Sequence, residues 1–308
     1  MRRLAFVLFT VLTVSLGSSF GFAQKGTLTV GSKIDTEGSV LAQIIRLVLE
    51  QNDFAVNDRS GFGTTSVVRE ALLAGEIDLY PEYTGSALTF FPDADLPEGV
   101  STDAQALYQT VKELDAERNN VTWLEQAPAN NTWAIAVPQS LAEENGLETL
   151  GDLATYINDG GEFKLAASQE FVDREDALPA FEETYGFEVS SDQLVILAGG
   201  NTTQTETAAA QGTDGVNAAM AYGTDGTISA LGLTTLDDPQ SAVAIYQPAP
   251  SVRGEVASQF PELAEILNPV FASLDEETLQ TLNGQVAVDG LDPAQVAEDY
   301  LTSEGFLQ

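Results

Sequence analysis

Short apolar runs alternate with segments of helical periodicity along most of the chain after Lys25. Residues 27–30 predict a first strand, and residues 40, 44, 47 and 48 then place apolar side chains on one helical face, behind Thr36 as a candidate helix cap. The same alternation predicts further strands and helices, with strands at 77–80, 121–124, 133–137, 163–167, 194–197, 216–222 and 243–246, and helices at 64–74 and 103–118. This pattern indicates layered α/β architecture with mostly parallel sheets.

The end of the chain has a different pattern. Residues 255–306 predict three helices, separated at Pro269, at Asn283-Gly284 and at Asp289-Gly290, and they should pack onto an existing sheet. Polar, proline-containing stretches at 127–131 and 237–240 are candidate crossings between two lobes. We therefore expect lobe 1 to comprise residues 26–129 plus 245–308, and lobe 2 to comprise residues 130–244.

The first 23 residues have the form of a secretory signal peptide. Arg2 and Arg3 precede an apolar run at 4–16, and Gly21-Phe22-Ala23 supplies small residues for cleavage. Serine and glycine at 15–19 interrupt the run before it reaches the roughly 20 apolar residues of a membrane span. No cysteine follows that could carry a lipid anchor. We expect a periplasmic protein, exported by a signal peptide at residues 1–23 and free of a lipid anchor.

Composition excludes several kinds of chemistry. The 308 residues include 12 Lys+Arg, 47 Asp+Glu, no His and no Cys, for a formal net charge of −35. A nucleic-acid partner is not expected, because such a chain has no basic face to neutralise phosphates. Triads that need His or Cys, zinc sites built from them, and disulfides are excluded as well. The carboxylates are spread along the whole chain, which favours a solvated acidic surface suited to high salt over a field that attracts a cationic partner.

Two segments at predicted strand or helix ends are candidate anion sites. Lys33 follows the first strand directly, at the edge of the sheet where open α/β proteins bind ligands, although a surface lysine would also fit. The segment 61–66 (Gly-Phe-Gly-Thr-Thr-Ser) could present backbone N–H groups to an anion, but Thr64 as an ordinary N-cap explains it equally well. The acidic residues at 93–98 lack the ordered spacing of a calcium loop, and we expect neither a metal nor a cofactor.

Aromatic side chains gather at predicted strand ends and crossings, where a cleft between two lobes would lie. They are Tyr80, Tyr83, Trp133, Tyr222 and Tyr246. Ring faces attract a quaternary ammonium, whose methyl groups also gain apolar burial. Core packing is the alternative for each ring taken singly, so the grouping is what favours a cleft.

Four segments in the same order resemble the glycine betaine, choline and osmoprotectant substrate-binding proteins of ABC importers. They are Gly31-Ser32-Lys33, the stretch from Gly63-Thr64-Thr65 through Asp78-Leu79-Tyr80-Pro81-Glu82-Tyr83-Thr84-Gly85, Asn130-Asn131-Thr132-Trp133-Ala134, and Tyr222-Gly223-Thr224-Asp225-Gly226. The resemblance implies a type II periplasmic binding protein fold, with two α/β lobes joined by two crossing strands. It also implies a monomer that is not an enzyme, that closes on a quaternary ammonium ligand and that delivers it to an inner-membrane ABC permease.

The resemblance assigns ligand-binding roles residue by residue. Tyr83 and Trp133 would be walls of an aromatic box, with Trp133 in place of the usual tyrosine. Lys33 and Arg174 would meet the ligand carboxylate, and Ser86 would supply a hydroxyl that is usually a threonine's. The remaining implied contacts are Asn131 at the lobe crossing, and Tyr222, Thr224 and Asp225 in a loop facing the cleft.

Three departures from the family pattern indicate a divergent branch with weaker binding. Residues 207–210 (Thr-Ala-Ala-Ala) stand where relatives commonly have another tyrosine, Asn217 replaces a usual aspartate, and residues 212–215 look inserted. Tyr246 or Arg253 could compensate for the missing ring. Two other functions stay open from the residues alone. A secreted carboxylate-dependent hydrolase needs neither His nor Cys, and a ligand-sensing lobe for a signalling partner would have the same cleft.

Overall fold

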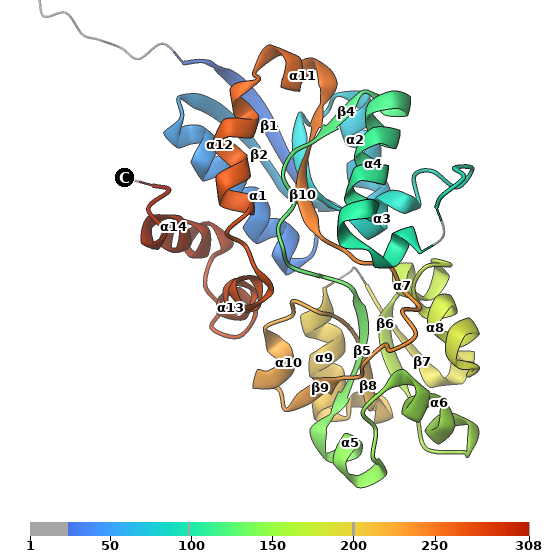
Figure 1. The fold of residues 1–308 in the computed structure, drawn as a ribbon. Helices are drawn as coiled ribbons and strands as arrows, with labels where there is room; N and C mark the ends of the chain where they lie inside the picture. The colour runs from blue at the N-terminus through green and yellow to red at the C-terminus, as the bar shows by residue number, and fades with distance from the viewer. Residues whose placement is uncertain (1–23, 98, 199–200, 308) are drawn as a thin grey trace, which may run out of the picture.

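Two separate five-stranded sheets, each flanked by helices, form two lobes stacked one above the other (Figure 1). The computed structural model describes residues 24–97, 99–198 and 201–307, so the expected signal peptide lies outside the described residues. The sheet of lobe 1 has the order β2-β1-β3-β10-β4, with β1 Gly26–Lys33, β2 Phe54–Gly63, β3 Leu79–Tyr83, β4 Val121–Trp123 and β10 Pro248–Arg253. The sheet of lobe 2 has the order β7-β6-β8-β5-β9, with β5 Trp133–Pro138, β6 Leu165–Ser168, β7 Leu194–Leu197, β8 Ala218–Tyr222 and β9 Leu233–Thr235.

Helices cover both sheets and continue past the last strand. Lobe 1 carries α1 Thr36–Gln51, α2 Thr65–Ala74, α3 Thr84–Leu88 and α4 Ala104–Asn119. Lobe 2 carries α5 Gln139–Asn145, α6 Leu150–Asn158, α7 Gln169–Asp173, α8 Leu178–Tyr185, α9 Thr202–Gln211 and α10 Thr227–Ala230. The chain ends with α11 Gly254–Gln259, α12 Glu262–Phe271, α13 Glu276–Ala287 and α14 Pro293–Ser303. None of the helices in the described ranges combines the length and the apolar character that a membrane span requires.

The predicted two-lobed α/β architecture is confirmed, but the expectation of mostly parallel sheets is wrong. Strand β10 is antiparallel to both β3 and β4, and β5 is antiparallel to both β8 and β9. These are the strands at which the chain enters lobe 2 and returns to lobe 1. Hydrophobic periodicity reports burial and not strand direction, which is why the pattern missed the reversal.

The apolar run at 243–246 is not the strand that its pattern predicts. It belongs to a crossing segment between β9 and β10, and the strand itself begins at Pro248. The run is apolar because Val243, Ala244 and Tyr246 are buried. The other crossing segment, between β4 and β5, runs alongside it, since Asn131 N donates to Tyr246 O at 2.9 Å and Ala127 N donates to Pro248 O at 2.8 Å. The two crossings thus form one hydrogen-bonded connection between the lobes.

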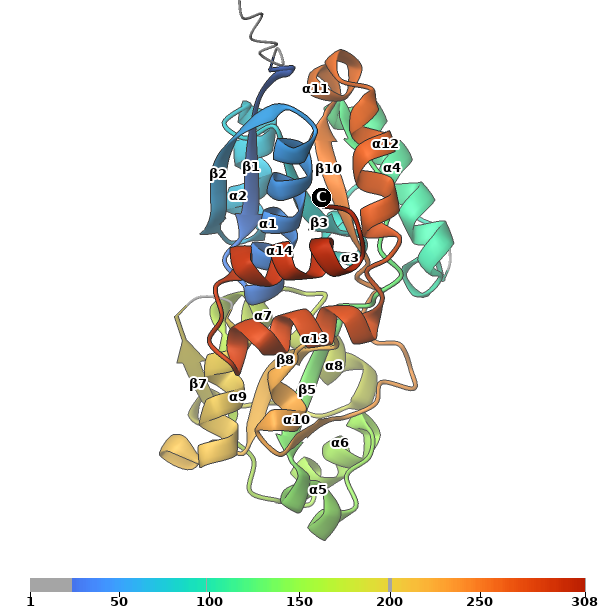
Figure 2. The ribbon, with the colours of Figure 1, turned by 90° about the vertical axis from the view of Figure 1, so that its left-hand side faces the viewer.

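The C-terminal region contains four helices instead of the three expected. Pro269 lies inside α12, and Asn283 and Gly284 lie inside α13, so none of these residues ends a helix. Helices α13 and α14 pack chiefly on α1 and on each other. Helix α13 also reaches lobe 2, because the backbone of Gly284 packs closely against Gly226, and Figure 2 shows α13 lying along the boundary between the lobes. The end of the chain therefore contacts both lobes.

Candidate ligand-binding site

A small cavity of about 30 Å³ lies between the two lobes. Residues from the ends of β1 and β3, the starts of α2 and α3, both crossings and lobe 2 line it, namely Lys33, Ile34, Asp35, Gly63, Thr64, Thr65, Tyr83, Ser86, Asn131, Trp133, Glu170, Arg174, Tyr222 and Tyr246. A water molecule needs roughly 10–15 Å³ of such space. The closed lobes therefore leave room for about two waters, and a larger ligand requires them to separate or side chains to move.

Four aromatic rings line the cavity, and Trp133 contacts two of the others. Trp133 begins β5 directly opposite Tyr222 at the end of β8, and this register puts the two ring centroids 4.6 Å apart. Trp133 also meets Tyr246 edge-on, with centroids 6.4 Å apart, and its indole N–H donates to the Tyr246 hydroxyl at 3.1 Å. Tyr83 lines the same cavity from the end of β3. Sequence reasoning grouped these rings by their places at strand ends, and the cavity brings them together.

Tyr246 reaches the cavity because a glycine faces it. A Cβ at Gly85 would lie 2.5 Å from the Tyr246 ring, so only a residue without a side chain leaves the ring its place. Arg253, the other residue considered for the missing wall, lies elsewhere and donates to Asp78 at 2.6 Å. Tyr80 is not among the residues that line the cavity, and its hydroxyl donates to Glu82 at 2.7 Å within lobe 1.

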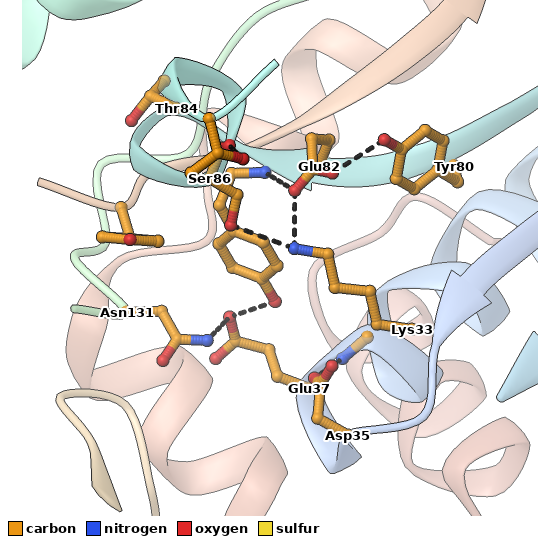
Figure 3. A network of polar contacts seen from close by, with 12 residues as sticks. Lys33, Asp35, Glu37, Tyr80, Glu82, Thr84, Ser86 and Asn131 are labelled. Atoms are coloured by element: carbon orange, nitrogen blue, oxygen red, sulfur yellow. Dashed lines mark hydrogen bonds and ion pairs between the residues drawn. The ribbon is translucent and has the colours of Figure 1, made fainter. Parts of the chain in front are cut away.

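Lys33 lines the cavity but is tied to a buried carboxylate. Its ammonium lies 2.6 Å from Glu82, whose side chain is fully buried, and donates to the Ser86 hydroxyl at 3.2 Å (Figure 3). The same ammonium lies 4.7 Å from the centroid of the Tyr83 ring. Glu82 also accepts from the backbone N–H of Tyr83 at 2.7 Å, so one carboxylate holds both residues in place.

Arg174 follows α7 on the lobe 2 side and is held by carboxylates of its own segment. It donates twice to Asp176, at 2.9 and 2.5 Å, and once to Glu170 at 3.1 Å. It also donates to the Tyr246 hydroxyl at 3.1 Å and lies 5.6 Å from the Trp133 ring. Burial alone would lower the pKa of Arg174, but Asp176, Tyr246 and Glu170 together outweigh it and raise the pKa, so the guanidinium stays charged at the cavity wall.

Two acidic residues near the cavity were missed by sequence reasoning. Asp35, not Thr36, caps α1 by accepting from Gly38 N at 2.6 Å, and it lines the cavity. Glu37, in the first turn of α1, is 3% exposed and accepts hydrogen bonds from four side chains. Burial raises the pKa of Glu37 to about 7, although bonds from Thr224 and Asn283 oppose the rise. An acidic residue just after a helix cap is so common that spacing alone carries no signal for this role.

Thr224 and Asp225, expected to face the cleft, turn to other partners behind it. The Thr224 hydroxyl donates to Glu37 at 2.5 Å, and Asp225 accepts from the backbone N–H of Tyr222 at 2.7 Å. Burial raises the pKa of Asp225 to about 6, and burial together with the charge of Asp225 raises that of the neighbouring Glu206. The two buried carboxyls therefore support the loop that carries Tyr222.

Known proteins are similar to this chain over most of its length. Residues 26–303 match a family model described as the substrate binding domain of ABC-type glycine betaine transport system. The chain is 56% identical over 277 residues to the glycine betaine-binding protein YehZ of Escherichia coli (strain K12), a match that covers 90% of each chain. It is 32% identical over 299 residues to a glycine-betaine-binding protein of Pseudomonas aeruginosa, covering 93% of this chain and 91% of that protein.

A solved structure of apo YehZ from Escherichia coli matches with a TM-score of 0.68 and 55% identity, over 91% of this chain and 99% of that one. The type II two-lobed fold and the role of ABC-importer binding protein that the resemblance implies are thereby confirmed. The chain belongs to the family of substrate-binding domains of ABC-type glycine betaine transport systems.

Proposed function

We propose that this protein binds a quaternary ammonium osmoprotectant between its lobes, glycine betaine first and choline or a related compound second, and delivers it to an ABC permease in the inner membrane. The observation that carries the proposal is the convergence of Tyr83, Trp133, Tyr222 and Tyr246 on one cavity with Arg174 at its wall. The names of the relatives from Escherichia coli and Pseudomonas aeruginosa support betaine as the first ligand to test. In this role the chain works as a binding protein without a catalytic step.

The site has to satisfy two poles of such a ligand. Each ring face contributes about 0.5–2 kcal/mol toward the methylated nitrogen. Arg174 is the proposed partner of a ligand carboxylate, and a bond from a charged donor contributes about 1.5–3 kcal/mol. Lys33, Ser86 and Asn131 complete the polar wall. Thr224 and Asp225 act from behind, by holding the loop of Tyr222.

Opening and closing of the lobes is the second part of the proposal, because the cavity is too small for the ligand as it stands. We assign lobe 1 to residues 26–129 and 245–308 and lobe 2 to residues 130–244, with the paired crossings as the hinge. Closure would bury both ligand poles, and the closed form would be the one that the permease recognises. Export by the leader at residues 1–23 would place the protein in the periplasm without a lipid anchor.

Isothermal titration calorimetry with glycine betaine, choline, carnitine and proline tests the ligand class. We expect binding of the quaternary ammoniums only. Tyr83→Ala and Trp133→Ala should each weaken betaine binding about tenfold or more, because each removes a wall of the box.

Tyr156→Ala is the matched control, since this tyrosine on α6 bonds Glu162 O away from the cavity, and it should bind betaine as the wild type does. Binding of proline without betaine would reject the aromatic box. Unchanged betaine affinity in both Tyr83→Ala and Trp133→Ala would mean that these two rings serve core packing and do not bind the ligand.

A further inference from the structure

Glu37 lies between four parts of the molecule. The binding site alone does not explain this position. Its Oε1 accepts from the Tyr83 hydroxyl at 2.9 Å and from Asn131 Nδ2 at 2.8 Å. Its Oε2 accepts from the Thr224 hydroxyl at 2.5 Å and from Asn283 Nδ2 at 2.8 Å. These donors come from β3, a lobe crossing, the loop after β8 and α13. One carboxyl group thus joins lobe 1, lobe 2, the hinge and the C-terminal helices.

The arrangement uses the full capacity of an ionised carboxylate, which accepts about four hydrogen bonds and donates none. The ion pairs found among the described residues include none to Glu37. Its charge is balanced by four neutral donors and by its position in the first turn of a 16-residue helix, where the helix dipole favours a negative group. The carboxyl of Asp35, on the same helix start, is the charged neighbour that opposes ionisation.

Tyr83 links this group to the ligand cavity. Its ring lines the cavity while its hydroxyl donates to Glu37, which itself is not among the cavity-lining residues. Hydrogen bonds polarise the groups they join, and a phenol that donates to a carboxylate has a more electron-rich ring. A more negative ring face attracts a cation more strongly. Thr224 can reach Glu37 only when lobe 2 lies against lobe 1, so the same carboxylate senses closure.

We infer that Glu37 is a positioning residue for ligand binding: by bonding Tyr83, Asn131, Thr224 and Asn283 together, it couples closure of the lobes to the cation-binding face of Tyr83. The inference rests on the proposed function, which supplies the ligand. Of the four residues that bond Glu37, only Tyr83 and Asn131 line the cavity. It assigns to α13, through Asn283, a part in ligand affinity without any contact with the ligand.

The test compares Glu37→Gln and Asn283→Ala with the wild type at pH 8, where the carboxyl is ionised. We expect betaine affinity to fall about tenfold or more in Glu37→Gln, because an amide cannot accept four donors, and about threefold or more in Asn283→Ala. Thr281→Ala is the control. It removes an exposed bond within the same helix, from the Thr281 hydroxyl to Glu277 O at 2.9 Å, but leaves the four donors of Glu37 untouched, and its affinity should stay within about twofold.

Lobe closure is measured separately, without ligand. The chain contains no cysteine, so Glu117→Cys on α4 and Glu183→Cys on α8, both exposed, accept two spin labels at defined places on the two lobes. Adding Glu37→Gln should shift the distance distribution between the two labels toward longer values, while Thr281→Ala should leave it unchanged. A circular dichroism spectrum and a melting curve establish that each variant is folded.

A double-mutant cycle between Glu37→Gln and Tyr83→Phe isolates the link to the ring. Coupling requires the double variant to lose clearly less affinity than the product of the two single losses. Additive losses, unchanged affinity in Glu37→Gln, or an unchanged label distance would each overturn the inference. Failure of the proposed function looks different, because the wild type itself would then bind no quaternary ammonium. The distance between the two spin labels without ligand would still test the role of Glu37 in lobe closure.

Discussion

The two halves of the cleft each present one cation, and they hold it in different ways. Lys33 of lobe 1 pairs with Glu82, a residue distant in sequence whose side chain is fully buried. Arg174 of lobe 2 pairs with Glu170 and Asp176 of its own segment, whose side chains are 24% and 32% exposed. The first pair is part of the lobe's interior, and the second is a local cluster in contact with water.

This difference assigns the two cations different tasks. A buried charge that loses its partner keeps its desolvation penalty, so the ammonium of Lys33 should stay with Glu82 when a ligand arrives. Partly exposed pairs contribute little and exchange partners easily. Arg174 can therefore give up part of its bonding to Asp176 in return for a ligand carboxylate, while Lys33 holds Ser86 and the Tyr83 ring in place.

The largest expected effect is on stability, from breaking the pair in lobe 1. Among the described residues, Glu82 is the only carboxylate that forms an ion pair with Lys33, so Glu82→Gln should lower the free energy of unfolding by about 3–5 kcal/mol. Asp176→Asn, the matched change in lobe 2, should lower it by about 1 kcal/mol or less. Urea unfolding followed by circular dichroism measures both values. Equal losses of unfolding free energy would mean that the ion pair of Lys33 is no more important for stability than that of Arg174.

The parts of the site that could be predicted from the sequence are those set by a local pattern, and not those that depend on a distant partner. Tyr83, Trp133, Tyr222 and Tyr246 stand at strand ends or crossings, and a pattern of strands is visible in the spacing of apolar residues. Lys33 was placed correctly at the end of β1 for the same reason. The spacing of apolar residues thus predicts the positions of side chains that stand at a strand end beside the cleft.

Partners that come from distant segments could not be predicted. Nothing in the chain near Glu37 points to Asn283 or Thr224, because their contact depends on how α13 and lobe 2 fold back onto α1. The antiparallel direction of β10 was missed for the same reason. Pro248 and Pro250 also disguise that strand, although its pairing with β3 places Pro250 opposite Pro81. Tertiary placement, not propensity, decides these features.

The second prediction concerns pH and again separates the two halves. The pKa of the Glu37 carboxyl is raised from an ordinary 4.5 to about 7, mainly by burial. Between these values the folded protein holds a proton that the unfolded chain has released. The contribution of this group to stability is therefore greatest below pH 4.5, falls as the pH rises and levels off above pH 7. The expected fall is on the order of 3 kcal/mol, at about 1.4 kcal/mol per pH unit.

Unfolding of wild type and Glu37→Gln between pH 4.5 and pH 8 measures this fall. The difference in unfolding free energy between the two proteins should change by that amount across the range, since glutamine does not titrate. Asp176→Asn changes a partly exposed carboxylate of lobe 2, where burial raises the pKa but Arg174 outweighs it and lowers the pKa below its ordinary value, so this variant should give a difference that stays constant above pH 4.5. A constant difference for Glu37→Gln would show that the pKa of this carboxyl is not raised in the folded protein.

The smallest effect, and the most selective, is expected for Arg174→Ala. This variant should weaken the binding of glycine betaine about tenfold, or roughly 1.4 kcal/mol. The binding of choline should weaken by less than about threefold, because choline has no carboxylate to meet the guanidinium. Calorimetry at one fixed ionic strength makes the comparison, since the net charge of −35 attracts choline in a salt-dependent way. Arg253→Ala, whose guanidinium bonds Asp78 outside the cavity, should change neither affinity. Equal losses of betaine and choline in Arg174→Ala would show that Arg174 holds the cleft together, as Lys33 does, and does not select the carboxylate.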